Sequence, residues 1–338
     1  PREVDAEWLA PRLAVFQAGT PGVQYILAPD EHADFTEANL DLAIRLVDGP
    51  GELEGVQLAP ALRVTVAAPE HRDAWIDWPG MALPEGVNPC TDHWQGIRCN
   101  YTNSYQEVHV TMLGLLNHNL TGTIPESIGN LTHLTGLGLD INNLHGTIPA
   151  CIGSNMPNLT ELSLTENFLN GSIPAWIGNL SHLEFLGLAD NLFTGPVPAS
   201  LAKLSRLLDL NIAENLLTGQ LPESFSNLTK LKVLYTFSNA FTGPIPAFVC
   251  DLVDLEYLAI YLNHHHGHIP ACFGDLSSLI YLMIYGNDLT GPLPPEIGQL
   301  STLQQLWIGE NRLTGTIPDT LAGLTSLLQF ISFQNLHT

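Results

Sequence analysis

The sequence predicts an α/β solenoid, a right-handed, curved superhelix of about ten 24-residue repeats with a parallel β-sheet on its concave face. Two observations predict this fold class. A glycine recurs every 24 residues from Gly122 to Gly315, with one step of 25, and a proline follows each glycine three residues later. Between these pairs runs the pattern L-x-x-L-x-L-x-x-N, as over residues 183–191. A unit this short cannot bury a hydrophobic core alone, so the copies are expected to stack on one another.

The L-x-L part of each repeat predicts a short strand with one buried face, because alternate residues of a strand point to the same side. The asparagine after each strand is expected to turn the chain and to satisfy backbone groups there with a buried amide. Proline cannot donate a hydrogen bond within a sheet, which assigns the Gly-x-x-Pro segments to the return side of each coil. The longer step matches an insertion at residues 154–157, interpreted as a bulge in one coil. Stacking would align the asparagines as a ladder: Asn142, Asn167, Asn191, Asn215, Asn239, Asn263, Asn287, Asn311 and Asn335.

Residues 1–87 do not follow the repeat and are predicted to be an N-terminal extension or a small α/β module of unknown role. Residues 36–49 carry apolar positions at helical spacing between a threonine N-cap and a glycine stop, which predicts a helix. Residues 57–67 alternate like a strand that Pro60 interrupts. The segment either packs on the first repeat or acts as an arm that docks on a neighbouring subunit.

The charge balance excludes several classes of partner. Acidic residues number 34 against 11 basic ones, for a formal charge of −23. Such a chain repels phosphate backbones, so nucleic acid is not expected as a partner. No apolar run approaches the roughly 20 residues that span a bilayer, so no transmembrane segment is predicted.

Export from the cell is predicted by N-x-[S/T] acceptors and by a close cysteine pair, Cys90 and Cys99, that brackets a tryptophan. A secreted or cell-surface glycoprotein is therefore expected. The acceptor asparagines are Asn100, Asn119, Asn130, Asn158, Asn170, Asn179 and Asn227.

Residues 120–125 (LTGTIP), 144–149 (LHGTIP) and 313–318 (LTGTIP) resemble the plant-type extracellular leucine-rich-repeat family. That family includes receptor-kinase ectodomains, receptor-like proteins and polygalacturonase-inhibitor-like proteins, and the resemblance covers residues 88–338. The stretch NPCTDHWQGIRC at 88–99 resembles the N-terminal cap of the family, which implies a Cys90–Cys99 disulfide and a disulfide-closed cap over 88–106. The solenoid then spans 107–338 and ends within a repeat, without a cysteine-bearing C-terminal cap. The resemblance implies a receptor, co-receptor or inhibitor role.

Outward-facing positions on the predicted concave face are acidic in the early repeats. Glu166, Asp190 and Glu214 share one register in three consecutive repeats, and Glu161 and Asp209 lie nearby. These carboxylates form either a solvated face or a site for calcium or for a ligand rich in Lys and Arg, because like charges at roughly 5 Å strand spacing repel one another.

The later repeats place large apolar and aromatic residues at the equivalent positions. Nine such residues in adjacent repeats exceed what strand propensity alone explains, and exposed apolar patches mark interfaces or ligand grooves. These residues are predicted to bind a ligand: Tyr235, Phe237, Tyr257, Tyr261, Tyr281, Met283, Tyr285, Trp307 and Phe333.

Two further clusters have open interpretations. His264, His266 and His268 surround His265, which replaces a core leucine; they are a local variation in a turn or weak candidates for a metal site. Cys250 and Cys272 come from consecutive coils and could form a disulfide if their Cα atoms lie within ~7 Å, which would leave Cys151 as the odd thiol.

No phosphate loop, zinc-protease helix or nucleophile elbow is present, which predicts a protein that is not an enzyme and has no cofactor. The first hypothesis is a binding module for a protein, peptide or polysaccharide. The alternative is a structural subunit of a filament, surface layer or wall matrix, assembled head-to-tail through the N-terminal segment and the uncapped last repeat. Ice binding is a third hypothesis. An ice-binding surface would favour a flat array of small residues such as threonine, whereas the concave positions carry residues of mixed type.

Overall fold

The computed structural model of the 338-residue chain describes residues 23–24, 45–46, 96–102 and 107–337. The chain divides into two compact units, Pro1–Ala61 and Leu62–Thr338. The predicted boundaries at residues 87 and 106 lie outside the described residues and stay predictions, as does the strand at 57–67.

In the first unit the structure describes a short antiparallel pair of strands, β1 (Val23–Gln24) and β2 (Arg45–Leu46). The helix predicted over 36–49 is therefore wrong at Arg45–Leu46. The pairing partner of β2 lies far upstream, and hydrogen bonds to it override the local helical preference, which is a weak guide by itself.

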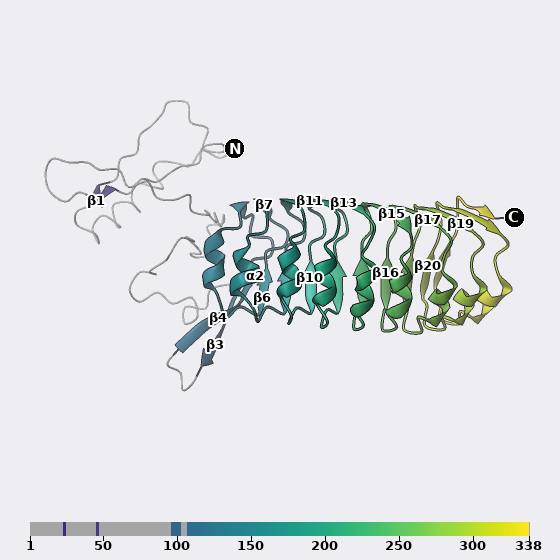
Figure 1. Cartoon of the computed structure of the whole chain (residues 1–338), viewed down its shortest axis with the longest axis horizontal. Helices are drawn as coiled ribbons and strands as arrows, with labels where there is room; N and C mark the ends of the chain where they lie inside the picture. The colour runs from purple at the N-terminus through teal and green to yellow at the C-terminus, as the bar shows by residue number, and fades with distance from the viewer. Residues whose placement is uncertain (1–22, 25–44, 47–95, 103–106, 338) are drawn as a thin grey trace, which may run out of the picture. The chain divides into compact units, whose positions relative to one another are not determined.

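The second unit is a solenoid of stacked coils (Figure 1), and its larger sheet contains eleven strands. Each coil adds one parallel strand, and at one edge β3 (Ile97–Thr102) pairs antiparallel with the first of them. The register joins equivalent residues of successive repeats, as in Leu186 with Leu210, which confirms the predicted L-x-L strands. The parallel strands are β4 (Glu107–Gly114), β6 (Gly136–Gly138), β8 (Glu161–Ser163), β10 (Phe185–Gly187), β12 (Asp209–Asn211), β14 (Val233–Tyr235), β16 (Tyr257–Ala259), β18 (Tyr281–Met283), β20 (Gln305–Trp307) and β22 (Gln329–Ile331).

A second, ten-stranded parallel sheet follows the asparagine positions, and the sequence analysis did not predict it. All of its strands but the last end at or next to a repeat glycine, and these glycines adopt positive φ, for example +82° at Gly219. Glycine takes this conformation without steric cost, so the repeat glycine turns the chain out of the strand. The strands are β5 (Thr121–Thr123), β7 (Asn143–Gly146), β9 (Phe168–Gly171), β11 (Leu192–Gly195), β13 (Leu216–Gly219), β15 (Ala240–Pro244), β17 (His264–Gly267), β19 (Asp288–Gly291), β21 (Arg312–Gly315) and β23 (Leu336–His337).

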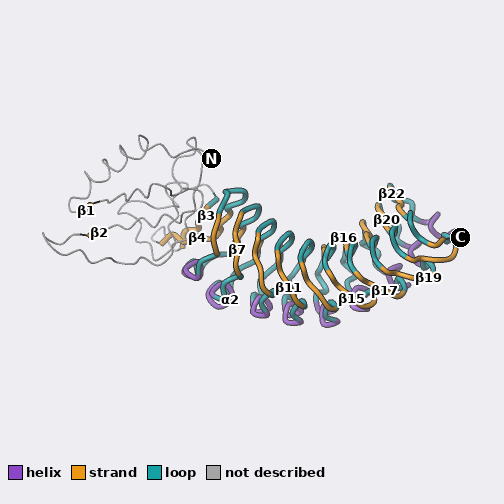
Figure 2. The backbone as a smooth tube through the Cα atoms, turned by 90° about the horizontal axis from the view of Figure 1, so that it is seen from above, coloured by secondary structure: helices purple, strands orange, loops and turns teal. Residues whose placement is uncertain are grey.

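Short helices complete the return side of the coils and follow one side of the solenoid in Figure 2. The repeat prolines are the N-caps of the 3₁₀ helices, where a missing N–H costs nothing. The coil with the insertion carries an α-helical turn instead, as expected of a local bulge. The helices are η1 (Glu126–Asn130), α2 (Cys151–Asn155), η2 (Ala175–Asn179), η3 (Ala199–Lys203), η4 (Glu223–Asn227), η5 (Ala247–Asp251), η6 (Ala271–Asp275), η7 (Pro295–Gln299) and η8 (Asp319–Gly323). Among the described residues no helix combines the length and apolarity needed to span a bilayer.

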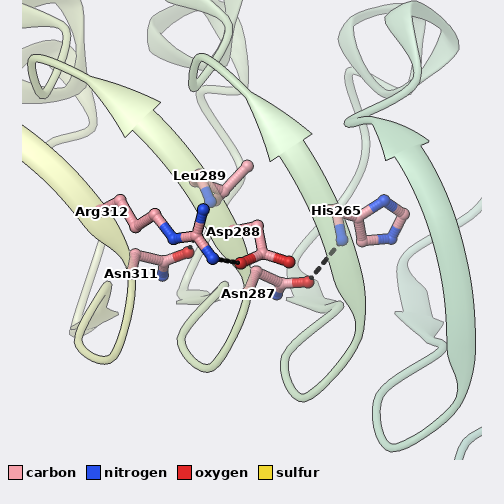
Figure 3. A network of polar contacts seen from close by, with 6 residues as sticks. All are labelled: His265, Asn287, Asp288, Leu289, Asn311 and Arg312. Atoms are coloured by element: carbon pink, nitrogen blue, oxygen red, sulfur yellow. Dashed lines mark hydrogen bonds and ion pairs between the residues drawn. The ribbon is translucent and has the colours of Figure 1, made fainter.

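The predicted asparagine ladder is present, and each rung ties two neighbouring coils together. The Asn191 side-chain oxygen accepts the Leu169 N–H at 2.9 Å. Its amide group donates to the carbonyl oxygens of Leu164, Leu188 and Ala189. The same pattern recurs at Asn287 and Asn311, two rungs shown in Figure 3. A continuous core of leucine, isoleucine and phenylalanine side chains lies between the two sheets and the helices.

A disulfide joins Cys250 of η5 to Cys272 of η6, with their Cα atoms 5.7 Å apart. Cys151 is a free cysteine, and burial raises the pKa of its thiol to about 11. Cys99 is disulfide-bonded, and its predicted partner Cys90 lies outside the described residues.

Peptide mapping of the oxidised protein without reducing agent is expected to recover one cross-linked pair that contains Cys250 and Cys272. Cys151 is expected to be alkylated only after denaturation, because a thiol with a raised pKa is poorly nucleophilic at neutral pH. A cross-link between Cys151 and either of the other two would contradict this pairing.

Candidate functional site

The residues predicted to bind a ligand lie on the later strands of the larger sheet, and the sheet register arranges them in columns. One column contains Tyr235, Met283 and Trp307, with Ala259 between the first two. Another contains Tyr257 and Tyr281, directly paired on β16 and β18. Because neighbouring strands lie about 4.8 Å apart, rings in one column are close enough to stack.

A third column, at the exit of the strands, forms a continuous stack of rings. The ring centroids of Phe237 and Tyr261 are 4.3 Å apart with an interplanar angle of 9°, and those of Tyr261 and Tyr285 are 4.4 Å apart at 12°. Trp307 extends the array, with its ring centroid 5.9 Å from that of Tyr285. Rings held by each other and by strands lose little further freedom when a ligand binds, which favours a binding surface.

A shallow hollow of about 200 Å³ opens beside this stack. We call the nine residues named in the sequence analysis the aromatic patch; eight are partly buried, and Phe333 is 57% exposed. The hollow is lined by Tyr235, Phe237, Leu258, Ala259, Tyr261, Tyr281 and Met283.

Carboxylates border the aromatic patch and perturb its tyrosines. Burial is the main cause that raises the pKa of the Tyr235 hydroxyl, and the charge of Asp209 adds to it. Burial likewise raises the pKa of Tyr261, with Tyr285 and Glu214 as further causes. These hydroxyls stay protonated at physiological pH and remain available as hydrogen-bond donors.

Asp209, on β12 at the edge of the aromatic patch, was not singled out within the acidic repeats by the sequence analysis. Its Oδ1 atom is buried and has no hydrogen-bond partner, and burial raises the pKa of the carboxyl to about 6. Asp140 differs, because its carboxylate accepts hydrogen bonds from the Ser163 hydroxyl and from the Thr165 N–H. Asp140 and Asp209 occupy different positions of the repeat, and only the structure shows that the first accepts these hydrogen bonds whereas Oδ1 of the second has no partner.

Glu166, Asp190 and Glu214 lie in the tight turns that leave the strands rather than within them. All three are exposed and have positive φ values of 50–54°. No group of three or more His, Cys, Asp or Glu side chains in the described part of the chain is arranged to hold a metal ion.

The histidine cluster lies on a strand, β17, and not in the predicted turn. His264, His266 and His268 are exposed, whereas His265 is fully buried in the core. Alternation along the strand separates His265 from its neighbours, and the structure brings no set of these histidines together as ligands.

The acceptor asparagines for N-glycosylation are all exposed. Asn130, Asn179 and Asn227 end helices η1, η2 and η4, so they share one flank of the first half of the solenoid. No acceptor follows Asn227 in the sequence, and that flank next to the aromatic patch carries none.

The second sheet carries a row of threonines that the sequence analysis did not identify. It occupies the position before the repeat glycine, where His145, Asn170 and His266 interrupt it, and the spacing shows it once this segment is taken as a strand. Its members are Thr121, Thr194, Thr218, Thr242, Thr290 and Thr314.

Stacked coils with a parallel concave sheet, an asparagine ladder and short return-side helices define a leucine-rich-repeat solenoid. The family model described as Leucine Rich Repeat matches residues 158–180, 206–228, 278–300 and 302–324. The chain contains leucine-rich repeats, and its structural neighbours are plant receptor-kinase ectodomains, which matches the plant-type extracellular leucine-rich-repeat family.

Several solved structures are similar to this chain. The ectodomain of the Arabidopsis thaliana receptor kinase GASSHO1/SCHENGEN3, in complex with CASPARIAN STRIP INTEGRITY FACTOR 2, is 34% identical with a TM-score of 0.69; the match covers 78% of this chain and 31% of that one. The Arabidopsis receptor kinase HAESA, in complex with the peptide hormone IDA and the co-receptor SERK1, is 30% identical with a TM-score of 0.65 over 75% of this chain and 46% of that one.

A plant ice-binding protein is 27% identical with a TM-score of 0.62, over 72% of this chain and 77% of that one. The chain thus spans less than half the length of the two receptor ectodomains that it matches. No curated protein matches the sequence.

Proposed function

We propose that this chain is a non-enzymatic, extracellular recognition module that binds a peptide through the aromatic patch. The observation that carries the proposal is the partly exposed stack Phe237–Tyr261–Tyr285 beside an apolar hollow. Aromatic clusters of this kind supply most of the binding energy at protein interfaces. A secreted glycoprotein fits the family and the exposed acceptor asparagines.

The receptor ectodomains support a peptide rather than a polysaccharide as the ligand. GASSHO1/SCHENGEN3 and HAESA were solved with a bound factor and a peptide hormone respectively. A further neighbour, RGFR1, is described as a plant peptide hormone receptor in complex with RGF2, at 34% identity and a TM-score of 0.57. An extended peptide matches the shape of ring columns that run across several coils.

Selection of a random linear-peptide display library on the glycosylated protein tests this proposal. Tyr261→Ala is expected to weaken the selected peptides about 30-fold, because it removes the centre of the stack and hot-spot side chains contribute about 2 kcal/mol or more. Phe168→Ala is the matched control, since Phe168 is an exposed aromatic residue on the second sheet, outside the aromatic patch. Dissociation constants measured by calorimetry decide the outcome, and peptides that bind both variants equally well would contradict the proposal.

The filament alternative is tested on the same sample by its native mass. Light scattering of a monodisperse monomer contradicts head-to-tail assembly, and open-ended polymers would support it.

Ice binding is a second candidate function, and the threonine row favours it. Hydroxyl groups repeated at the strand spacing can order a row of water molecules. Thr194, Thr242 and Thr290 already donate to glycine carbonyl oxygens of the preceding strand, which orients their hydroxyls. A freezing-point depression that is lost in Thr218→Val would support this function, and its absence in the unmodified protein would reject it.

A further inference from the structure

The aromatic patch carries acidic groups at its borders and no basic group. Asp209 lies on β12, the strand next to β14 with Tyr235, and the backbone N–H groups of Glu214 and Glu310 donate to the carbonyl oxygens of the patch residues Phe237 and Phe333. No Lys or Arg occupies a strand or exit-turn position between residues 136 and 334 on the larger sheet. The surface therefore presents ring faces and negative charge together.

Two of the basic side chains near the patch strands, those of Lys232 and Arg312, are already in ion pairs. The Lys232 ammonium lies 2.7 Å from a Glu256 carboxylate oxygen, and the Arg312 guanidinium 2.7 Å from Asp288. Figure 3 shows the second pair at the start of β19 and β21, on the other sheet. Neither cation compensates the border carboxylates.

Asp209 is the border residue whose hydrogen bonding is incomplete. Its buried Oδ1 has no donor, and nothing positive faces it among the described residues. A buried acceptor without a partner is unfavourable, and a carboxylate in this position is satisfied best by a charged donor. Tyr235 beside it offers a ring face, which also attracts cations.

We propose that the peptide bound by the aromatic patch is basic, with a Lys or Arg side chain at Asp209 and Tyr235 and apolar residues along the ring stack towards Trp307. This inference rests on the proposed function, because it specifies the ligand of the same site. A peptide that presents a free carboxylate at this end is disfavoured by Asp209 and Glu214 together. Asp209 is thus a specificity-determining residue rather than part of the apolar binding surface.

The test repeats the peptide selection on three proteins, the unmodified chain, Asp209→Asn and the control Glu161→Gln. Glu161 occupies the same column as Asp209, two strands earlier, so its loss changes the net charge equally without touching the patch border. Peptides from the unmodified chain and from Glu161→Gln are expected to be enriched in Lys and Arg next to an apolar segment. Asp209→Asn is expected to select apolar peptides without that enrichment.

One selected peptide and its Arg→citrulline analogue, which keeps the shape and loses the charge, then complete a double-mutant cycle. The analogue is expected to bind the unmodified chain about tenfold more weakly and Asp209→Asn less than about twofold more weakly. Thermal melting of Asp209→Asn verifies that the fold is retained.

The outcomes separate the two proposals. The proposal of a basic ligand would be overturned if the selected peptides depend on the aromatic patch but are not enriched in Lys and Arg. It would also be overturned if the citrulline analogue loses the same affinity for both proteins. Either result leaves the proposed function in place. If no selected peptide binds Tyr261→Ala more weakly than it binds the unmodified chain, both the basic ligand and the proposed function would be overturned.

Discussion

Asn191→Ala is expected to lower the free energy of unfolding of the solenoid by about 4 kcal/mol. The substitution removes four hydrogen bonds at once and leaves the Leu169 N–H buried without a partner. The three carbonyl oxygens each keep one other donor, so each of those lost bonds contributes about 0.5–1.5 kcal/mol. Each buried polar group left unpaired costs about 1–3 kcal/mol, and the residue is only 5% exposed, so water cannot replace the amide. Urea unfolding followed by circular dichroism measures the change.

Two further variants identify the amide as the cause. Asn191→Asp keeps an acceptor but has no donor for the three carbonyl oxygens, so it is expected to destabilise at least as much. Asn211→Ala is the control, because Asn211 lies outside the ladder and its side-chain oxygen accepts only the Ala213 N–H among the described contacts. A loss below about 1 kcal/mol for Asn191→Ala would mean that the coils are held by the apolar core alone.

His265→Phe is expected to remove a pH dependence of stability worth about 3 kcal/mol. His265 is fully buried on β17 and occupies the same position of the repeat as the buried core residues Phe241 and Leu289. One ring nitrogen, Nδ1, donates to the Gly243 carbonyl oxygen at 3.4 Å, and Nε2 has no partner. Burial is the main cause that lowers the pKa of this imidazole from 6.5 to about 4.

The direction of the pH effect follows from these two pKa values. Between pH 6.5 and pH 4 the unfolded chain binds a proton at this site and the folded chain does not, so stability falls as pH falls through that window. The difference between these two pKa values corresponds to about 3 kcal/mol of folding stability, which is fully present above pH 6.5. Below about pH 4 both states are protonated and the contribution changes no further.

The comparison is made between variants, because other titrating groups change stability over the same range. Unfolding free energies at pH 7 and pH 4.5 are expected to differ less for His265→Phe than for the unmodified chain. His264→Gln, which alters an exposed neighbour on the same strand, is expected to keep the full difference. Equal pH slopes for the unmodified chain and His265→Phe would show that the imidazole is hydrated or charged in the folded state.

The 24-residue period of glycine and proline and the alternation of leucines were sufficient to predict the coil, the L-x-L strands and the asparagine ladder. The columns of the aromatic patch follow from the same register, since Phe237, Tyr261 and Tyr285 lie 24 residues apart. These features depend on spacing along the chain, which the sequence contains in full. The proposed ligand surface is in this sense a sequence prediction, although its binding role awaits the peptide selection.

The tertiary structure decided what depends on contacts between coils. The second sheet was missed because its segments lack the L-x-L alternation and contain the repeat glycine, a residue depleted in strands. The β1–β2 pair was missed because Val23–Gln24 lies far upstream of Arg45–Leu46. Asp140 and Asp209 are the same residue type on the same face, yet one accepts hydrogen bonds from a neighbouring strand and the other holds a buried oxygen without a partner. Burial and hydrogen bonding are set by the side chains of adjacent coils, so Asp209 could be singled out among the acidic residues only once those coils were placed together.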